Sequence, residues 1–341
     1  MTTNKKNKYP LGLYLLVGVF CLCAALLHGV VLATEQAAGS SKSVKSPEDT
    51  PLKQMPAGEG LYTRKGADTC LKCHDDDYKY PIYPVFFSKH GDRNDKRTPM
   101  AQLQCESCHG PGRAHATEPK VGFKRAQIIS FGVNTSTGAA VQNQQCIQCH
   151  NNNDHLSWVG SAHERQNVLC VSCHTLHKRK DPVLDKTLQA KACYSCHKKQ
   201  RAEFARNSVH PVRYGKMVCT QCHNPHGSLS DALLKTSTRN ETCYTCHAEK
   251  RGPFLWAHAP VAEDCGTCHE HHGSMHAPLL KKRPPLLCQQ CHAPAGHPST
   301  AYTEGGLASV IPNTYLLAKS CLNCHAQVHG SNHPSGVKLM R

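Results

Sequence analysis

The longest apolar run of this 341-residue chain lies near its start, at residues 11–31. Three lysines precede the run, and the small residues Val31-Leu32-Ala33 end it. A positive start, an apolar middle and a small-residue end are typical of a secretory signal peptide, so we predict that residues 1–33 are removed on export. A run of about 20 residues is also long enough to span a bilayer, and a retained anchor is the alternative interpretation.

Beyond this run the apolar residues are sparse and show hardly any strand-like alternation. Residues 34–60 are rich in Ser, Lys, Pro, Ala and Gly, and we expect a flexible leader there. Farther along, Pro and Gly cut the chain into loops, and short helices are predicted at residues 188–201 and 241–251. The predicted fold class is therefore short α-helices and coil, with little or no β-sheet, in one domain at residues 61–341.

The composition does not support an ordinary hydrophobic core. Hydrophobic residues make up 39% with cysteine included and aromatic residues 6%, whereas the chain has 22 Cys and 25 His. If cysteine and histidine bind a cofactor, too few Leu, Ile, Val and Phe remain to fill the interior. The cofactor itself would then have to supply much of the apolar interior.

A Cys-x-x-Cys-His box recurs ten times after the leader. Cys21 and Cys23 lie in the apolar run, and all the remaining cysteines of the chain belong to the boxes. The box cysteines are Cys70, Cys73, Cys105, Cys108, Cys146, Cys149, Cys170, Cys173, Cys193, Cys196, Cys219, Cys222, Cys243, Cys246, Cys265, Cys268, Cys288, Cys291, Cys321 and Cys324. The box histidines are His74, His109, His150, His174, His197, His223, His247, His269, His292 and His325.

This box is the attachment signature of c-type haem, in which two thiols bond to the porphyrin and the histidine becomes the proximal iron ligand. Zinc sites and disulfide frameworks also use spaced cysteine pairs. Neither explains why histidine follows the second cysteine in all ten boxes. We therefore predict ten covalently bound c-type haems.

Spare histidines repeat with the boxes. Residues 193–226 contain two boxes, one histidine between them, His210, and one after them, His226. Applying this unit along the chain predicts five dihaem modules, at about residues 61–130, 131–180, 181–230, 231–279 and 280–341. We call the histidine between two boxes the inner histidine and the one after them the outer histidine. The predicted distal iron ligands are His90, His115, His163, His177, His210, His226, His258, His272, His297 and His329, with His333 as the alternative to His329.

The remaining histidines and the charge have simpler explanations. His155, His271 and His276 have no counterpart in other modules and are predicted to lie at the surface or behind a ligand. The net charge of +16 falls to +13 without the three lysines of the signal. Ten ferric haems, each about −1 with two ionised propionates, bring it to roughly +3. The basic residues are thus predicted to pair with propionates, and no nucleic-acid partner is expected.

The predicted iron ligands indicate what the haems can do. Ten proximal and ten distal histidines would close every iron, so the irons could exchange electrons but could not bind a substrate. We therefore expect an electron-transfer protein with low potentials. A multihaem reductase, which needs an open iron, is one alternative, and a soluble periplasmic shuttle to a terminal reductase such as dimethyl sulfoxide reductase is another.

Several segments resemble one known family. They include Cys105-Glu-Ser-Cys108-His109-Gly-Pro, Cys243-Tyr-Thr-Cys246-His-Ala-Glu-Lys-Arg-Gly-Pro, Leu-Trp256-Ala-His258-Ala-Pro, Cys288-Gln-Gln-Cys291-His and the ending Cys321-Leu-Asn-Cys324-His-Ala-Gln-Val-His329-Gly-Ser-Asn-His333-Pro-Ser-Gly. From about Gly60 to the C-terminus the chain is similar to the MtrA/DmsE family of periplasmic decahaem cytochromes, with MtoA and PioA among its relatives.

The resemblance implies an extended haem wire within an outer-membrane β-barrel porin of the MtrB type. It also implies partners on both sides, namely periplasmic or inner-membrane cytochromes and an outer-surface multihaem cytochrome. The expected location is the periplasm, in association with the outer membrane. Electrons would serve extracellular metal reduction or iron oxidation, since low-potential haems conduct in either direction.

Overall fold

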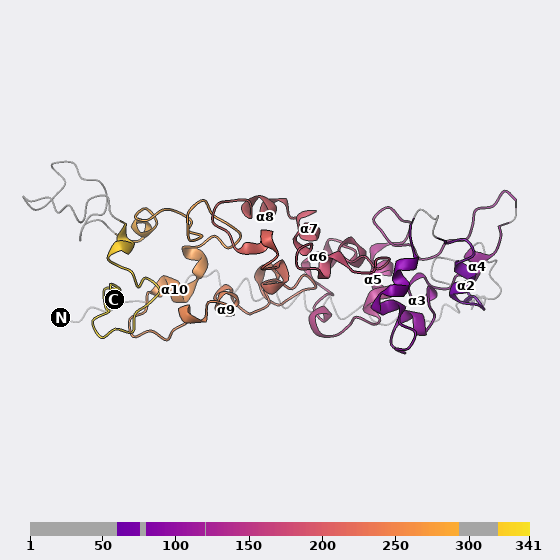
Figure 1. Cartoon of the computed structure of the whole chain (residues 1–341), viewed down its shortest axis with the longest axis horizontal. Coiled ribbons are helices and arrows are strands. Elements are labelled where there is room, and N and C mark those ends of the chain that lie inside the picture. The colour runs from indigo at the N-terminus through magenta and orange to yellow at the C-terminus, as the bar shows by residue number, and fades with distance from the viewer. Residues whose placement is uncertain (1–59, 76–79, 120, 293–319) are drawn as a thin grey trace, which may run out of the picture. The chain divides into compact units, whose positions relative to one another are not determined.

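The computed structural model describes residues 60–75, 80–119, 121–292 and 320–341, all of which belong to one compact unit, Thr50–Arg341. The predicted signal peptide, almost all of the leader and His297 lie outside the described residues. The described residues form short helices joined by long loops and contain no β-strand, as Figure 1 shows. Isolated bridges replace a sheet. The predicted architecture of short helices and coil, with little or no β-sheet, is confirmed for the described residues.

The helices are rarely longer than two turns. Within the described residues the α-helices are α2 (Ala67–Cys70), α3 (Glu106–His109), α4 (Arg113–Ala116), α5 (Ala139–Ile147), α6 (Ala162–Arg165), α7 (Gln189–Tyr194), α8 (Lys198–Glu203), α9 (Arg239–Tyr244) and α10 (Ala259–Glu263). The 3₁₀ helices are η1 (Tyr83–Phe87), η2 (Lys89–Gly91), η3 (Pro99–Ala101), η4 (Asn153–His155), η5 (Cys170–Ser172), η6 (Pro182–Leu184), η7 (Pro211–Tyr214), η8 (Cys219–Gln221), η9 (Asp231–Leu233), η10 (Ala248–Lys250), η11 (Cys265–Thr267), η12 (Cys288–Gln290) and η13 (Cys321–Asn323). No helix among the described residues combines the length and apolar character needed to cross a bilayer.

The two helices predicted from the sequence are each broken at a box. The segment at residues 188–201 consists of α7 and α8, and the segment at 241–251 consists of α9 and η10. The box histidine lies at each break, with φ −82° and ψ 67° at His197 and φ −104° and ψ 49° at His247. These ψ values are far from the helical region, so the chain turns at the histidine and a continuous helix is impossible.

Among the residues that the structure describes, few are buried, and the buried ones are as often polar as hydrophobic. The buried hydrophobic residues are Ala67, Met100, Ile129, Trp158, Leu169, Phe204, Val212 and Leu280. The buried polar residues are Glu106, Thr137, Gln142, Asn143, Ser161, Gln189, Asn240, Thr242, Ser274 and Ser331. Hydrophobic burial by these few side chains cannot by itself offset the chain entropy of a unit this long. This balance agrees with the expectation that bound haem fills much of the interior.

Buried amides connect the two boxes of a module. The side-chain oxygen of Asn143, three residues before Cys146, accepts a hydrogen bond from the Cys170 backbone N–H at 2.9 Å. Asn240 stands in the same place before the first box of the fourth module and binds the Cys265 N–H at 2.7 Å. Both amide groups also donate to backbone carbonyls, those of Val168 and of Val261 in α10, so their buried polar atoms are satisfied. The amides thus hold the second box in a fixed place beside the first.

Paired backbone hydrogen bonds connect successive predicted modules. Ser208 and Ser274 exchange two such bonds, of 3.0 and 2.8 Å, at the junction between the third and fourth modules. Trp256 and Ser331 exchange bonds of 2.8 and 2.9 Å at the next junction. Gly273 precedes Ser274 with φ +150°, and a Cβ there would lie 2.2 Å from the Glu203 carbonyl oxygen. Only glycine permits this backbone approach, and it directly follows an outer histidine.

Candidate haem sites

Every box forms one helical turn. In each box the histidine N–H donates to the carbonyl of the first cysteine, four residues earlier, over 2.8–3.0 Å. Residues at positions i, i+3 and i+4 share one face of such a turn, so both thiols and the imidazole point the same way. All 20 box cysteines are free thiols rather than disulfides. One turn therefore offers the two sulfurs and one nitrogen that covalent haem attachment needs.

The box thiols lie close to thiols of neighbouring boxes in an alternating pattern. The first cysteines of two boxes interact in the pairs Cys70–Cys105, Cys146–Cys170, Cys193–Cys219, Cys243–Cys265 and Cys288–Cys321, where the neighbouring thiol helps to raise the pKa of the first cysteine named. The second cysteines interact electrostatically in the pairs Cys108–Cys149, Cys173–Cys196, Cys222–Cys246 and Cys268–Cys291. The contacts between first cysteines therefore lie within the predicted modules, and the contacts between second cysteines lie between successive modules.

Nine box histidines each face one of the spare histidines at a nearly constant distance. The ring centroids are 6.0–6.4 Å apart in the pairs His74–His115, His109–His177, His150–His90, His174–His226, His197–His163, His223–His272, His247–His210, His269–His329 and His292–His258. A histidine–metal bond is about 2 Å long and the ring centre lies about 1 Å farther back, so two imidazoles on one metal have centroids about 6 Å apart. The spacing thus fits an iron between each pair.

Most of these pairs cross a module boundary. The inner histidine of one module faces the first box of the next, as His210 faces His247. In return, the outer histidine of the later module faces the second box of the earlier one, as His272 faces His223. This reciprocal exchange recurs at all four junctions. His74 differs, because it faces His115 of its own module, and the histidine predicted for the last box, His297, lies outside the described residues.

Hydrogen bonds orient many of the rings. The Nδ1 atoms of eight histidines lie 2.7–3.0 Å from backbone carbonyl oxygens; these are His109, His115, His163, His210, His223, His258, His269 and His325. A carbonyl can only accept, so Nδ1 must carry the proton and Nε2 keeps its lone pair. This is the tautomer that binds a metal through Nε2.

Two further rings hydrogen-bond to carboxylates. Nδ1 of His174 lies 2.6 Å from Oδ2 of Asp181, and Nδ1 of His272 lies 3.2 Å from Oε2 of Glu203. Neither carboxylate stands at a fixed offset from a box, so the sequence carries no signal that finds them. The fold brings them to the histidines through η6 and the end of α8.

The two candidates at the C-terminus differ in their surroundings. His329 faces His269 with centroids 6.2 Å apart and ring planes only 12° apart. Nδ1 of His333 accepts a hydrogen bond from the Ser335 backbone N–H at 3.2 Å, which leaves the proton on Nε2. A protonated Nε2 has no lone pair for a metal. The geometry therefore favours His329.

One spare histidine lies against a facing pair. The ring of His155 packs on His226, with centroids 4.1 Å apart, and lies 5.7 Å from His150. Burial, with a smaller effect from His155, lowers the pKa of His226 to about 4 and keeps its ring neutral, the form that binds metal. His155 therefore supports a facing pair from behind, in line with one of its two predicted roles.

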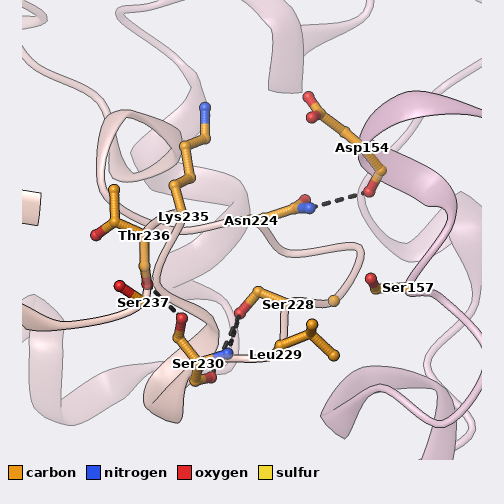
Figure 2. A pocket seen from close by; sticks show the side chains of 10 residues that line it. Asp154, Ser157, Asn224, Ser228, Leu229, Ser230, Lys235, Thr236 and Ser237 are labelled. Carbon is orange, nitrogen blue, oxygen red and sulfur yellow. Dashed lines mark hydrogen bonds between the residues drawn. The ribbon is translucent and has the colours of Figure 1, made fainter.

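One described hollow is separate from the facing pairs. It has a volume of about 450 Å³ and is lined by polar side chains, Asp154, Asn224 and Lys235 among them. Figure 2 shows Asn224 reaching the Asp154 carbonyl, a hydrogen bond of 3.0 Å that joins the second and third modules. No histidine or cysteine lines it. Moreover, the described residues hold no cluster of three or more metal-ligating side chains, as a zinc site would need.

Comparisons with known proteins agree with this chemistry. The family model of a doubled CXXCH motif matches residues 210–252 and 258–297. The model of the NrfB-like c-type cytochromes matches residues 105–188, and that of cytochrome c554 and c-prime matches residues 33–110. The multihaem cytochrome MtrA of Shewanella baltica (strain OS185) is 49% identical over 288 residues, which are 83% of this chain and 84% of that protein. The chain thus binds c-type haems covalently and functions in electron transport.

Proposed function

Because this chain belongs to the MtrA family of multihaem cytochromes c, we propose that it carries ten haems and conducts electrons across the outer membrane. The haem supplies iron that gains and loses one electron. The ten boxes attach the haems, and their histidines are the proximal ligands. The ten inner and outer histidines are the distal ligands, with His329 rather than His333 at the last module.

The observation that carries the proposal is the spacing of the nine histidine pairs. An imidazole on each side of an iron leaves no coordination position for a substrate, so the residues favour outer-sphere electron transfer over catalysis at the metal. The carbonyl acceptors hold the rings in place, which limits reorganisation when the charge on the iron changes. A multihaem reductase would instead need at least one box histidine without a facing ring.

A sheath is needed for the conducting role. A polar backbone crosses lipid only where its hydrogen bonds are satisfied, and the mature sequence offers no apolar span for the bilayer's roughly 40–45 Å. We propose that a β-barrel porin of the MtrB type surrounds the periplasmic cytochrome. Periplasmic or inner-membrane cytochromes would exchange electrons at one end and an outer-surface multihaem cytochrome at the other. The second candidate is a soluble shuttle to a terminal reductase, which requires no porin.

The test is reconstitution with the porin in liposomes that enclose a redox dye. External iron compounds should change the oxidation state of the dye only when cytochrome and porin are both present. Electron transfer to a soluble reductase without any transfer across the liposome wall would favour the shuttle. In the same preparation, electron paramagnetic resonance should show ten low-spin ferric haems, and a high-spin, five-coordinate haem would favour the enzyme.

A further inference from the structure

Two of the facing histidine pairs have a carboxylate behind one ring, where others have a backbone carbonyl. Asp181 stands behind His174, which faces His226, and Glu203 stands behind His272, which faces His223. In box order these are the fourth and sixth haem sites. They lie near the middle of the chain, with the site of the His197–His163 pair between them.

Asp181 is held firmly in its position. Its side chain is 13% exposed, and Oδ1 accepts hydrogen bonds from the backbone N–H groups of Thr175 (3.2 Å) and Val183 (3.3 Å). These bonds leave Oδ2 directed at Nδ1 of His174, 2.6 Å away. A separation this short is typical of a charge-assisted hydrogen bond, the stronger class in proteins.

Glu203 makes a longer contact of the same kind. It ends α8, its side chain is 12% exposed, and Oε2 lies 3.2 Å from Nδ1 of His272. Lys199, one helical turn earlier, brings its Nζ to 3.9 Å from the other carboxylate oxygen. The lysine side chain is 81% exposed, so solvent screens much of its charge. Glu203 should therefore act on its iron in the same sense as Asp181, but more weakly.

A carboxylate behind a ligand histidine favours ferric iron for two reasons. It draws the Nδ1 proton toward itself, which makes Nε2 a stronger electron donor to the metal. Its negative charge, partly shielded from water, also stabilises the extra positive charge of the oxidised state. A neutral carbonyl acceptor, such as Pro278 behind His269, has a weaker effect on both counts.

We propose that Asp181 and Glu203 are positioning residues that lower the reduction potentials of the fourth and sixth haems. The inference rests on the histidine ligation proposed above. Reduction adds one electron to ferric iron and gives ferrous iron, while the shared proton stays between imidazole and carboxylate and no bond forms or breaks. During reduction of the protein, these two central haems accept electrons later than neighbouring haems whose ligand histidines hydrogen-bond to backbone carbonyls.

A third carboxylate provides a contrast within the chain. Glu249 lies 3.8 Å from Nδ1 of His247, beyond hydrogen-bonding distance, and its side chain is 61% exposed. At that distance and exposure its charge is screened and it cannot draw on the ring proton. The seventh haem should therefore lack the lowering that the fourth and sixth receive.

The experiment compares haem-resolved redox titrations of the complete holoprotein and its variants. In Asp181→Asn, one haem should become easier to reduce by at least tenfold in its equilibrium constant, which is 59 mV for one electron. Glu203→Gln should move a different haem in the same direction by a smaller amount. Asp185→Asn and Glu241→Gln are matched controls, since these exposed carboxylates bind Thr187 and Arg251 rather than a histidine, and neither should shift any potential.

Electron paramagnetic resonance of the same samples separates the possible failures. Unchanged potentials in both variants, with every haem still low-spin, would overturn the inference and leave the proposed function intact. A high-spin haem in the wild-type protein would overturn the ligation itself. If Asp181→Asn loses its haem, the redox titration of Glu203→Gln tests the inference. Asp181→Glu, which keeps a carboxylate at this position, should have the low potential of the wild-type haem.

Discussion

The first junction between modules and the third are held together by different means. At the first junction the contacts come from side chains, with Gln148 donating to the Ser107 carbonyl at 3.3 Å and Arg179 lying over the Phe87 ring. At the third, Ser208 and Ser274 exchange two backbone hydrogen bonds. Both junctions nevertheless have the same exchange of facing histidines. The histidine exchange is therefore the shared feature, and the backbone pairing is an addition.

Residues after the outer histidines explain the difference. His226, His272 and His329 are each followed by Gly-Ser, whereas His177 is followed by Lys178 and Arg179. Where glycine is present, its left-handed backbone lets the chain approach the preceding module closely enough for backbone contact. Without it, the first junction should depend more on the irons that its histidines share.

Removal of an outer histidine should have the largest effect, and a larger one at the first junction. His177→Ala should accelerate amide exchange around the first junction, and His272→Ala should accelerate it around the third. The acceleration in His177→Ala should be at least ten times that in His272→Ala, a difference of about 1.4 kcal/mol. Hydrogen exchange followed by mass spectrometry measures both. His276→Ala is the control, and equal acceleration in the two variants would contradict the comparison.

Substitution of the junction glycine should come next. In Gly273→Ala the new methyl group meets the Glu203 carbonyl at 2.2 Å, at a φ of +150°, and should cost about 2–3 kcal/mol through overpacking and backbone strain. Thermal unfolding of the holoprotein, followed by haem absorption, reports the loss. Gly138→Ala is the matched control, because a Cβ there meets nothing within 4 Å and its φ is −64°. Equal melting temperatures would show that the close approach is unimportant.

The smallest effect is expected from Ser208→Ala. The variant keeps both backbone bonds with Ser274 but loses the hydroxyl oxygen that accepts from the Leu279 N–H at 2.8 Å. One hydrogen bond contributes about 1 kcal/mol, so local amide exchange should accelerate about fivefold at the third junction. Ser195→Ala, which removes an exposed hydroxyl bonded within its own turn, should leave the junction unchanged. Similar exchange in both variants would rule out a role for the Ser208 hydroxyl.

Much of the site could be read from the sequence because its chemistry is local. The box fits within one helical turn, so five residues identify it without knowledge of the fold. The spare histidines repeat with the boxes, and nine of the ten chosen in this way each face a box histidine. Their partners could not be read from spacing, because His210 faces His247 across a junction rather than a box of its own module.

The contacts of the two carboxylates with ligand histidines could not be predicted from the sequence either. Asp181 follows His174 by seven residues and Glu203 precedes His272 by 69, and neither interval recurs in other modules. The break in the predicted helix at residues 188–201 could not be read from the sequence pattern either, because it arises from the non-helical backbone of a single residue, His197. Local composition predicts a helix there, whereas the orientation of the box decides where it ends.

The reciprocal exchange of histidines has a consequence for how such a chain can grow by gene duplication. On the proposed ligation, an internal module gives one histidine forward and one back, and receives one from each side. A duplicated module inserted between two others would therefore leave the coordination of every iron unchanged. Insertion of a single box would leave an iron short of a ligand. Viable descendants should gain or lose haems in pairs, and the first module, which keeps His115 for its own His74, should change least.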